Sequence, residues 1–143
     1  MTLRARIVVA DRIAREDAVF IEEQINEFNY DATGYRDGRE LAAIVRDEEG
    51  AIIAGLTGFT WGGCCKVMFL WVAEPYRRAG LGSALVGAAE DEARSRGCKL
   101  LFLETHDFQA PRFYERLGFE AVSRYDDYPL GYGQTSFRKR LDR

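Results

Sequence analysis

The sequence predicts an α+β fold, a sandwich in which helices cover both faces of a mixed, mostly antiparallel sheet of about six to seven strands. The prediction depends on two observations. Strand-like segments follow one another across short turns at several places, and one strand–helix–strand unit lies in the middle of the chain. Short turns join antiparallel strands, whereas a helical crossover joins parallel ones, so the two together predict a mixed sheet.

The first third of the chain predicts a strand, a helix and a loop. Alternating residues over Arg4–Ala10 are typical of a strand. Apolar residues then recur at helical spacing from Ala14 to Phe28, after Asp11 as a capping residue. The glycine-containing stretch Asn29–Arg39 is expected to form a loop.

Three strands joined by tight turns follow, over Glu40–Arg46, Ala51–Trp61 and Cys65–Ala73. The third contains the apolar run Val67–Val72. Such a run is typical of a strand buried on both faces, so we expect it in the middle of the sheet.

The second half of the chain alternates between helices and strands. An apolar stripe and a C-terminal Gly97 define the clearest helix, Ser83–Arg96. The remaining expected elements are a strand over Lys99–His106, a short helix over Ala110–Leu117, and two strands over Glu120–Tyr125 and Gln134–Leu141.

Size and composition are those of one soluble domain. The 143 residues contain 47% hydrophobic and 30% charged side chains, so we expect one domain over residues 1–143. A segment of about 18 apolar residues and a secretory signal are both lacking, which predicts a cytoplasmic protein without a membrane partner. The net charge of −3 argues against a general nucleic-acid binder.

The three cysteines are Cys64, Cys65 and Cys98. Their number is odd and two of them are adjacent, which predicts buried or half-buried free thiols and not a disulfide. Because the sequence has no CxxC pair and no histidine cluster, we expect no metal site.

The turn between the apolar strand and the long helix is the most informative segment. It reads Arg77-Arg78-Ala79-Gly80-Leu81-Gly82-Ser83 and opens a helix. A helix N-terminus offers free N–H groups and partial positive charge, and glycine lets a ligand approach the backbone closely, so the turn predicts a phosphate site. The lysine of a Walker loop is missing, and Leu85 occupies the third glycine position of a Rossmann fingerprint, which disfavours a nucleotide-binding protein of either class.

The pattern Arg77-x-x-Gly80-x-Gly82 resembles the acyl-CoA pyrophosphate loop of the GNAT superfamily of N-acetyltransferases. Ala110, Tyr114 and the Gly118-Phe119 pair are similar to the second signature of that family. The order of strands and helices also matches over nearly the whole chain, and the segments around residues 104–111 and 127–129 resemble a branch of small bacterial members. The resemblance implies a GNAT-like α/β sandwich that binds acetyl-CoA and no metal.

The resemblance also implies roles for particular residues. Tyr114 matches a tyrosine that protonates the leaving thiolate. Asp107 occupies a position where the family frequently has an asparagine that contacts the cofactor, and a carboxylate cannot donate as an amide does. The other cofactor-binding residues would be the strand end Leu70, Trp71 and Val72 and the turn residues Arg77, Arg78, Ala79, Gly80, Leu81, Gly82 and Ser83.

Acetyl transfer to an alkyl amine needs a proton acceptor, because an amine with a pKa of about 10 is protonated at neutral pH. Some family members carry a glutamate on the central strand, but the segment Cys65–Ala73 has no acid. Glu104 on the next strand is the first candidate. Asp107, Asp126 and a chain of water molecules remain alternatives.

Two functions remain open. The first is an N-acetyltransferase, a homodimer as the resemblance implies, that acts on a primary amine by direct attack in a ternary complex. The second is a non-catalytic acyl-CoA-binding or sensor domain on the same fold, because fold alone does not define function. Tyr114 also lies on an apolar stripe, so packing in the core is an alternative to its role as proton donor, and the two are compatible.

Overall fold

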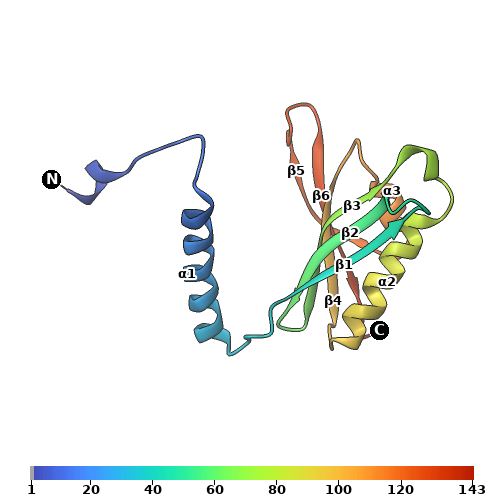
Figure 1. Cartoon of the computed structure of the whole chain (residues 1–143), viewed down its shortest axis with the longest axis horizontal. Helices are drawn as coiled ribbons and strands as arrows, with labels where there is room; N and C mark the ends of the chain where they lie inside the picture. Colours follow the sequence, from blue (N-terminus) through green and yellow to red (C-terminus); the bar gives the residue numbers. More distant parts are fainter. Residues whose placement is uncertain (1) are drawn as a thin grey trace. The chain divides into compact units, whose positions relative to one another are not determined.

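The computed structural model describes residues 2–143, which divide into two compact units. The first unit ends at Arg36 and the second runs from Asp37 to Arg143 (Figure 1). The prediction of one domain over residues 1–143 stays a prediction.

The first unit contains a short 3-10 helix, η1 (Leu3–Arg6), and one long helix, α1 (Arg15–Thr33). The predicted strand over Arg4–Ala10 is therefore wrong. Alternation supports a strand only where a neighbouring strand supplies hydrogen-bond partners, and residues 7–10 join no ladder of the described structure.

The loop predicted from Asn29 is wrong for its first residues, because α1 continues to Thr33. Gly34 ends the helix with a φ of 78°, and its N–H donates to the carbonyl of Tyr30 at 2.8 Å. Arg36 then bonds back to Glu27 at 3.0 Å and Asp31 at 2.6 Å. The residues that follow α1 are therefore held against the helix by these contacts.

The second unit is built on a six-stranded sheet with the order β1-β2-β3-β4-β6-β5. Only β3 and β4 pair in parallel, so the sheet is mixed and mostly antiparallel as predicted. The strands are β1 (Arg39–Arg46), β2 (Ile52–Trp61), β3 (Cys64–Val72), β4 (Leu100–His106), β5 (Glu120–Asp126) and β6 (Gly133–Arg140).

Two helices of the second unit lie beside each other against the sheet. Helix α2 (Leu81–Ser95) follows the short 3-10 helix η2 (Glu74–Tyr76) and packs against β1, β2 and β3. Helix α3 (Pro111–Arg116) adjoins its first turn, because a Cβ atom at Gly82 would lie 3.2 Å from the ring of Phe113. The expectation that helices cover both faces of the sheet stays a prediction.

The core of the second unit lies between α2, α3 and the sheet. Its largest fully buried side chains include Phe137, Leu56, Leu101 and Leu103. Cys65 and Cys98 are also buried, Cys64 is half-buried, and all three are free thiols, as predicted. Burial raises the pKa of the Cys65 thiol to about 11.

Strand β3 occupies the centre of the sheet as predicted, between β2 and β4. The expectation that both of its faces are buried stays a prediction. Val67 faces the core, but Phe69 and Trp71 are 72% and 51% exposed. Within the second unit, the apolar run therefore has one face against the core and one open face.

Among residues 2–143, no helix has both the length and the apolar character that a membrane span requires.

Leu101→Ala and Leu130→Ala form a matched pair of substitutions that tests the position of the core. Leu101 is fully buried, whereas Leu130 is 85% exposed. We expect Leu101→Ala to lower the free energy of unfolding by about 2–5 kcal/mol. Leu130→Ala should change it by less than about 0.5 kcal/mol. Urea denaturation measures both, and equal losses would show that the core lies elsewhere.

Candidate active site

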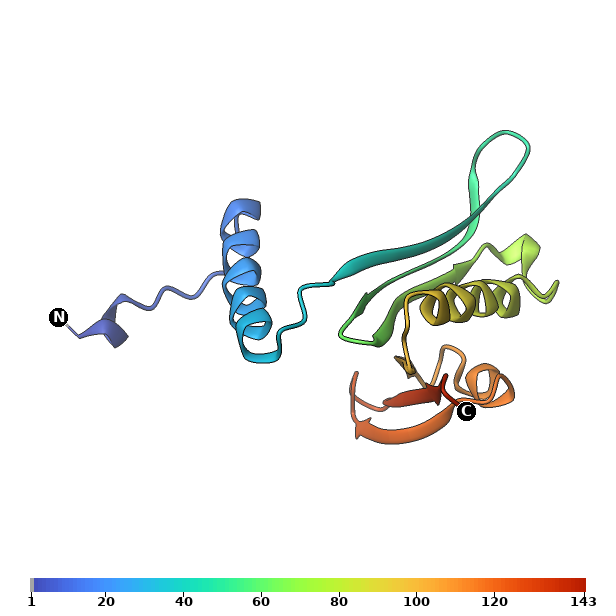
Figure 2. The same cartoon turned by 90° about the horizontal axis from the view of Figure 1, so that it is seen from below.

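The two central strands of the sheet separate soon after they meet. Strands β3 and β4 pair only through Cys64–Lys66 and Leu100–Phe102. Figure 2 shows the consequence, with β1–β3 and α2 on one side and β5, β6 and α3 on the other. The backbone edge of β3 after Lys66 therefore faces a widening space instead of a neighbouring strand.

A β-bulge lies where the separation begins. Thr57 pairs with Phe69 and Gly58 pairs with Val67, which leaves Met68 as the extra residue of β3. A bulge bends its strand and increases the local twist. Gly58 permits the close approach, because a Cβ atom there would collide with the backbone carbonyl of Lys66.

A pocket of about 180 Å³ lies between the separating strands. Successive side chains of a strand point to opposite faces of the sheet. On β4, Leu103 and Thr105 are buried on the face against which the helices of this unit pack, called here the helix face. Glu104 points to the opposite face, called here the open face. Tyr114 enters from α3 on the helix face. The lining residues are Val67, Met68, Phe69, Leu70, Leu103, Glu104, Thr105, Gln109, Ala110 and Tyr114.

Tyr114 belongs to the core and to the pocket wall at once. It is 7% exposed, and its ring lies 5.7 Å from that of Phe119 and 6.2 Å from that of Phe137, centroid to centroid. Burial raises the pKa of its hydroxyl, so the group is protonated at neutral pH. Of the two roles that the sequence leaves open for Tyr114, the structure shows the core packing, and the role as proton donor stays a prediction.

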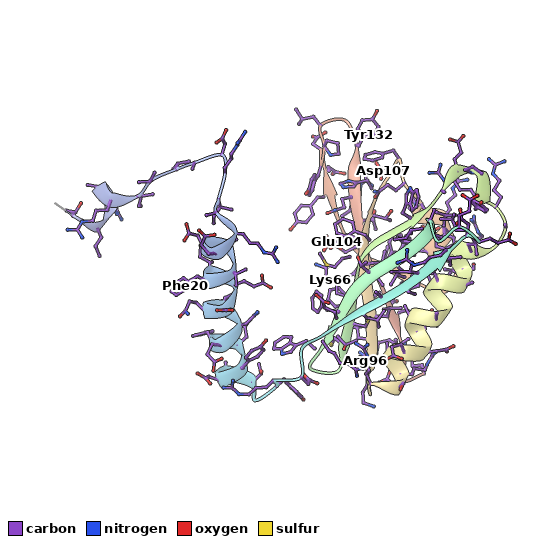
Figure 3. All side chains as sticks on the ribbon, viewed as in Figure 1. Phe20, Lys66, Arg96, Glu104, Asp107 and Tyr132 are labelled. Carbon is purple, nitrogen blue, oxygen red and sulfur yellow. The ribbon has the colours of Figure 1, made fainter. Side chains whose placement is uncertain are left out.

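Glu104 is the predicted carboxylate that the structure places in this pocket. Its Oε1 lies 3.7 Å from Nζ of Lys66 on β3, and Figure 3 shows the two side chains next to each other. Neither Asp107 nor Asp126 is among the residues that line the pocket of the described structure. Lys66 was not predicted as a site residue, although the sequence has this one charged residue directly before the apolar run Val67–Val72.

The predicted phosphate turn leads directly into α2. Arg78 and Gly80 have φ angles of 65° and 85°, and Gly80 caps the helix without a side-chain hydrogen bond. The N–H groups of the first turn are thus not capped by a side chain, which is the arrangement that binds phosphate. Arg77 has a different contact, since its Nε donates to the carbonyl of Val72 at 2.8 Å and supports the turn.

Asp107 follows β4 and is engaged by the β5–β6 hairpin. Its carboxylate accepts hydrogen bonds from Arg124 at 2.7 and 2.9 Å and from the N–H of Gly133 at 2.7 Å. These donors, Arg124 first, lower the pKa of Asp107 to about 2. The contact of Asp107 with a cofactor stays a prediction. Its partner Arg124 was not predicted, because no local sequence pattern indicates an ion pair between the turn after β4 and a strand of the later hairpin.

The chain matches the Acetyltransferase (GNAT) family over residues 9–119. An acetyltransferase of Agrobacterium fabrum is 32% identical over 134 residues, which are 94% of this chain and 98% of that one. The blasticidin-S acetyltransferase of Streptomyces morookaense is 44% identical over 85 residues, 59% of this chain and 62% of the relative. The chain therefore belongs to the GNAT acetyltransferase family, and it is an acyltransferase.

Solved structures show the same fold. An acetyltransferase from Agrobacterium tumefaciens has a TM-score of 0.88 and 31% identity, and the match covers 94% of this chain and 98% of that one. A streptothricin acetyltransferase from Bacillus anthracis, solved with acetyl coenzyme A, has a TM-score of 0.62 and 20% identity over 71% of this chain and 62% of that one. The GNAT-like architecture predicted from the sequence is confirmed.

The ion pair of Asp107 predicts a pH dependence with a definite sign. The pKa of Asp107 in the folded protein is about 2, below the ordinary value of 3.8. The contribution of the ion pair to the free energy of unfolding is therefore complete above about pH 3.8 and is lost as the pH falls through about 2. A carbon-13 NMR titration of the Asp107 carboxyl group should show the lowered midpoint. In Arg124→Gln the midpoint should rise, and a midpoint of 3.8 in the unmodified protein would contradict the geometry.

Proposed function

We propose that the protein transfers the acetyl group of acetyl-CoA to a primary amine of a small molecule, by direct attack in a ternary complex. One observation carries the proposal. The separating strands β3 and β4 enclose a pocket that Glu104 reaches from the open face of the sheet and Tyr114 from the helix face. A thioester held between the strands would have a proton acceptor on one side and a proton donor on the other.

The cofactor would lie along the turn and the free edge of β3. The pyrophosphate would accept N–H bonds at the start of α2, from Gly80 to Ser83, with the charge of Arg78 nearby. The pantetheine arm would pair with backbone groups of Leu70, Trp71 and Val72, as an added strand pairs with a sheet edge. The relative solved with acetyl coenzyme A shares this fold, which supports the choice of cofactor.

The reaction would begin with loss of a proton from the amine. For an amine with a pKa of about 10, deprotonation at neutral pH costs roughly 4 to 5 kcal/mol. Glu104 accepts this proton, directly or through water, and the amine nitrogen attacks the thioester carbonyl carbon. A backbone N–H near Leu70 donates to the developing oxyanion.

Collapse of the tetrahedral intermediate then breaks the carbon–sulfur bond. The Tyr114 hydroxyl donates a proton to the leaving thiolate, and the attacking nitrogen releases its second proton to water. The products are the N-acetylated amine and free CoA. The raised pKa keeps the hydroxyl protonated at neutral pH, so its proton is present when the thiolate forms. Tyr114 recovers its proton from solvent or from the protonated Glu104 through water.

The relatives favour a catalytic protein over a sensor, since those named above are acetyltransferases. Blasticidin S is the acceptor that one relative's name gives, and it is our first candidate for this chain. We further propose that the protein acts in the cytoplasm as a homodimer, without nucleic acid as a partner.

Tyr114→Phe and Glu104→Gln test the two proposed proton transfers. Each substitution keeps the shape of the side chain, so the dissociation constant for acetyl-CoA should stay within about twofold while kcat falls by about 10²–10⁴-fold. Thiol release with a panel of amines measures kcat, and calorimetry measures binding. Tyr125→Phe is the matched control, because Tyr125 is 66% exposed on β5. Wild-type kcat in both variants would show that these groups carry no proton.

A further inference from the structure

The turn after β4 is tied to the end of the β5–β6 hairpin by paired contacts. Besides the Arg124 ion pair, the N–H of Asp107 donates to the carbonyl of Gly133 at 2.9 Å, and the N–H of Gly133 donates back to the carboxylate at 2.7 Å. Figure 3 labels Asp107 and Tyr132 at the same end of the sheet. The hairpin end therefore has a fixed position against this turn.

Arg124 is held on both sides. Its two terminal nitrogens donate to Asp107, and its Nε donates to Asp126 at 2.9 Å. The guanidinium lies so close to Gly133 that a Cβ atom there would collide with it. A bidentate pair of this kind fixes direction as well as distance, which a lysine cannot reproduce.

The same turn forms one end of the pocket. The Oε1 atom of Gln109 accepts the N–H of His106 at 2.7 Å, and the N–H of Gln109 donates to the carbonyl of His106 at 2.9 Å. Thr105, Gln109 and Ala110 all line the pocket that contains Glu104. The turn that carries Asp107 is thus continuous with one wall of the pocket.

Four rings gather where the hairpin meets the turn. His106 stacks on Phe108 with 5.1 Å between centroids, and the rings of His106 and Tyr128 meet edge to face, also with 5.1 Å between centroids. Tyr132 meets Phe108 edge to face at 5.3 Å. Phe108, Tyr128 and Tyr132 are 58%, 54% and 50% exposed, so this ring cluster presents an aromatic surface to solvent.

The ring cluster lies on the side of the sheet from which the amine would approach. His106 is two residues after Glu104 on β4, so both side chains point to the open face. An amine that reaches Glu104 along this face passes the rings. Aromatic faces bind flat groups by stacking and cations by their π electrons.

We propose that the ring cluster selects the acceptor, as an amine joined to a flat or second cationic group, and that Asp107 and Arg124 are positioning residues that hold the cluster in place. This inference rests on the proposed function, because it assigns the acceptor side of the same site. It assigns different roles to two neighbouring carboxylates: Glu104 accepts the proton of the amine, and Asp107 holds the ring cluster in position through Arg124.

The test compares Phe108→Ala and Arg124→Gln with the wild-type protein, using the amine that gives the highest kcat/KM among blasticidin S, 2-phenylethylamine and spermidine. We expect the KM for the amine to rise about tenfold in both variants, which corresponds to about 1.4 kcal/mol. The kcat and the dissociation constant for acetyl-CoA should each stay within about twofold. Arg124→Lys should recover part of the loss, because it keeps the charge but not both contacts.

Arg138→Gln is the matched control. Arg138 pairs with Glu120 at 2.8 Å on the same hairpin, and its exposure resembles that of Arg124 at 47% and 45%, but it lies away from the ring cluster. Its KM should not change. An unchanged KM in Phe108→Ala and Arg124→Gln would overturn this inference alone, and so would an equal rise in Arg138→Gln. Absence of turnover by the wild-type protein with every amine would overturn the proposed function and this inference together.

Discussion

The site depends on the short length over which the two central strands pair. Strands β3 and β4 join through only three residues each, Cys64–Lys66 and Leu100–Phe102. A longer parallel ladder would satisfy the backbone edge of β3 and close the pocket. The bulge at Met68, opposite Gly58, bends β3 where pairing stops. The separation thus leaves backbone groups of a central strand free to bind a ligand.

The separation also lets side chains from both faces of one sheet meet in one pocket. Tyr114 comes from the buried face and has a raised pKa, whereas Glu104 comes from the open face beside Lys66. Under the proposed function, a bound thioester would lie between these two side chains. The hairpin that Arg124 joins to Asp107 then borders the open side.

Much of the fold was predictable from local patterns. The strands and helices from residue 39 onward were predicted to within a few residues, because hydrophobic periodicity and glycine positions define such elements. The strand over Arg4–Ala10 failed because a strand needs a partner that no local pattern supplies. The phosphate turn and Tyr114 were predicted from motifs, whereas Lys66 and Arg124 were not, since their contacts join segments that are distant in the sequence.

Hydrogen–deuterium exchange of the backbone amides tests the central claim most directly, with acetyl-CoA as ligand and ATP as control. The free edge of β3 is proposed to receive the cofactor, so acetyl-CoA should slow exchange at Leu70–Val72 and in the turn Arg78–Ser83. ATP should not slow exchange at Leu70–Val72, because it lacks a pantetheine arm. Unchanged exchange of these strand residues with acetyl-CoA would contradict the account, and so would equal protection by ATP.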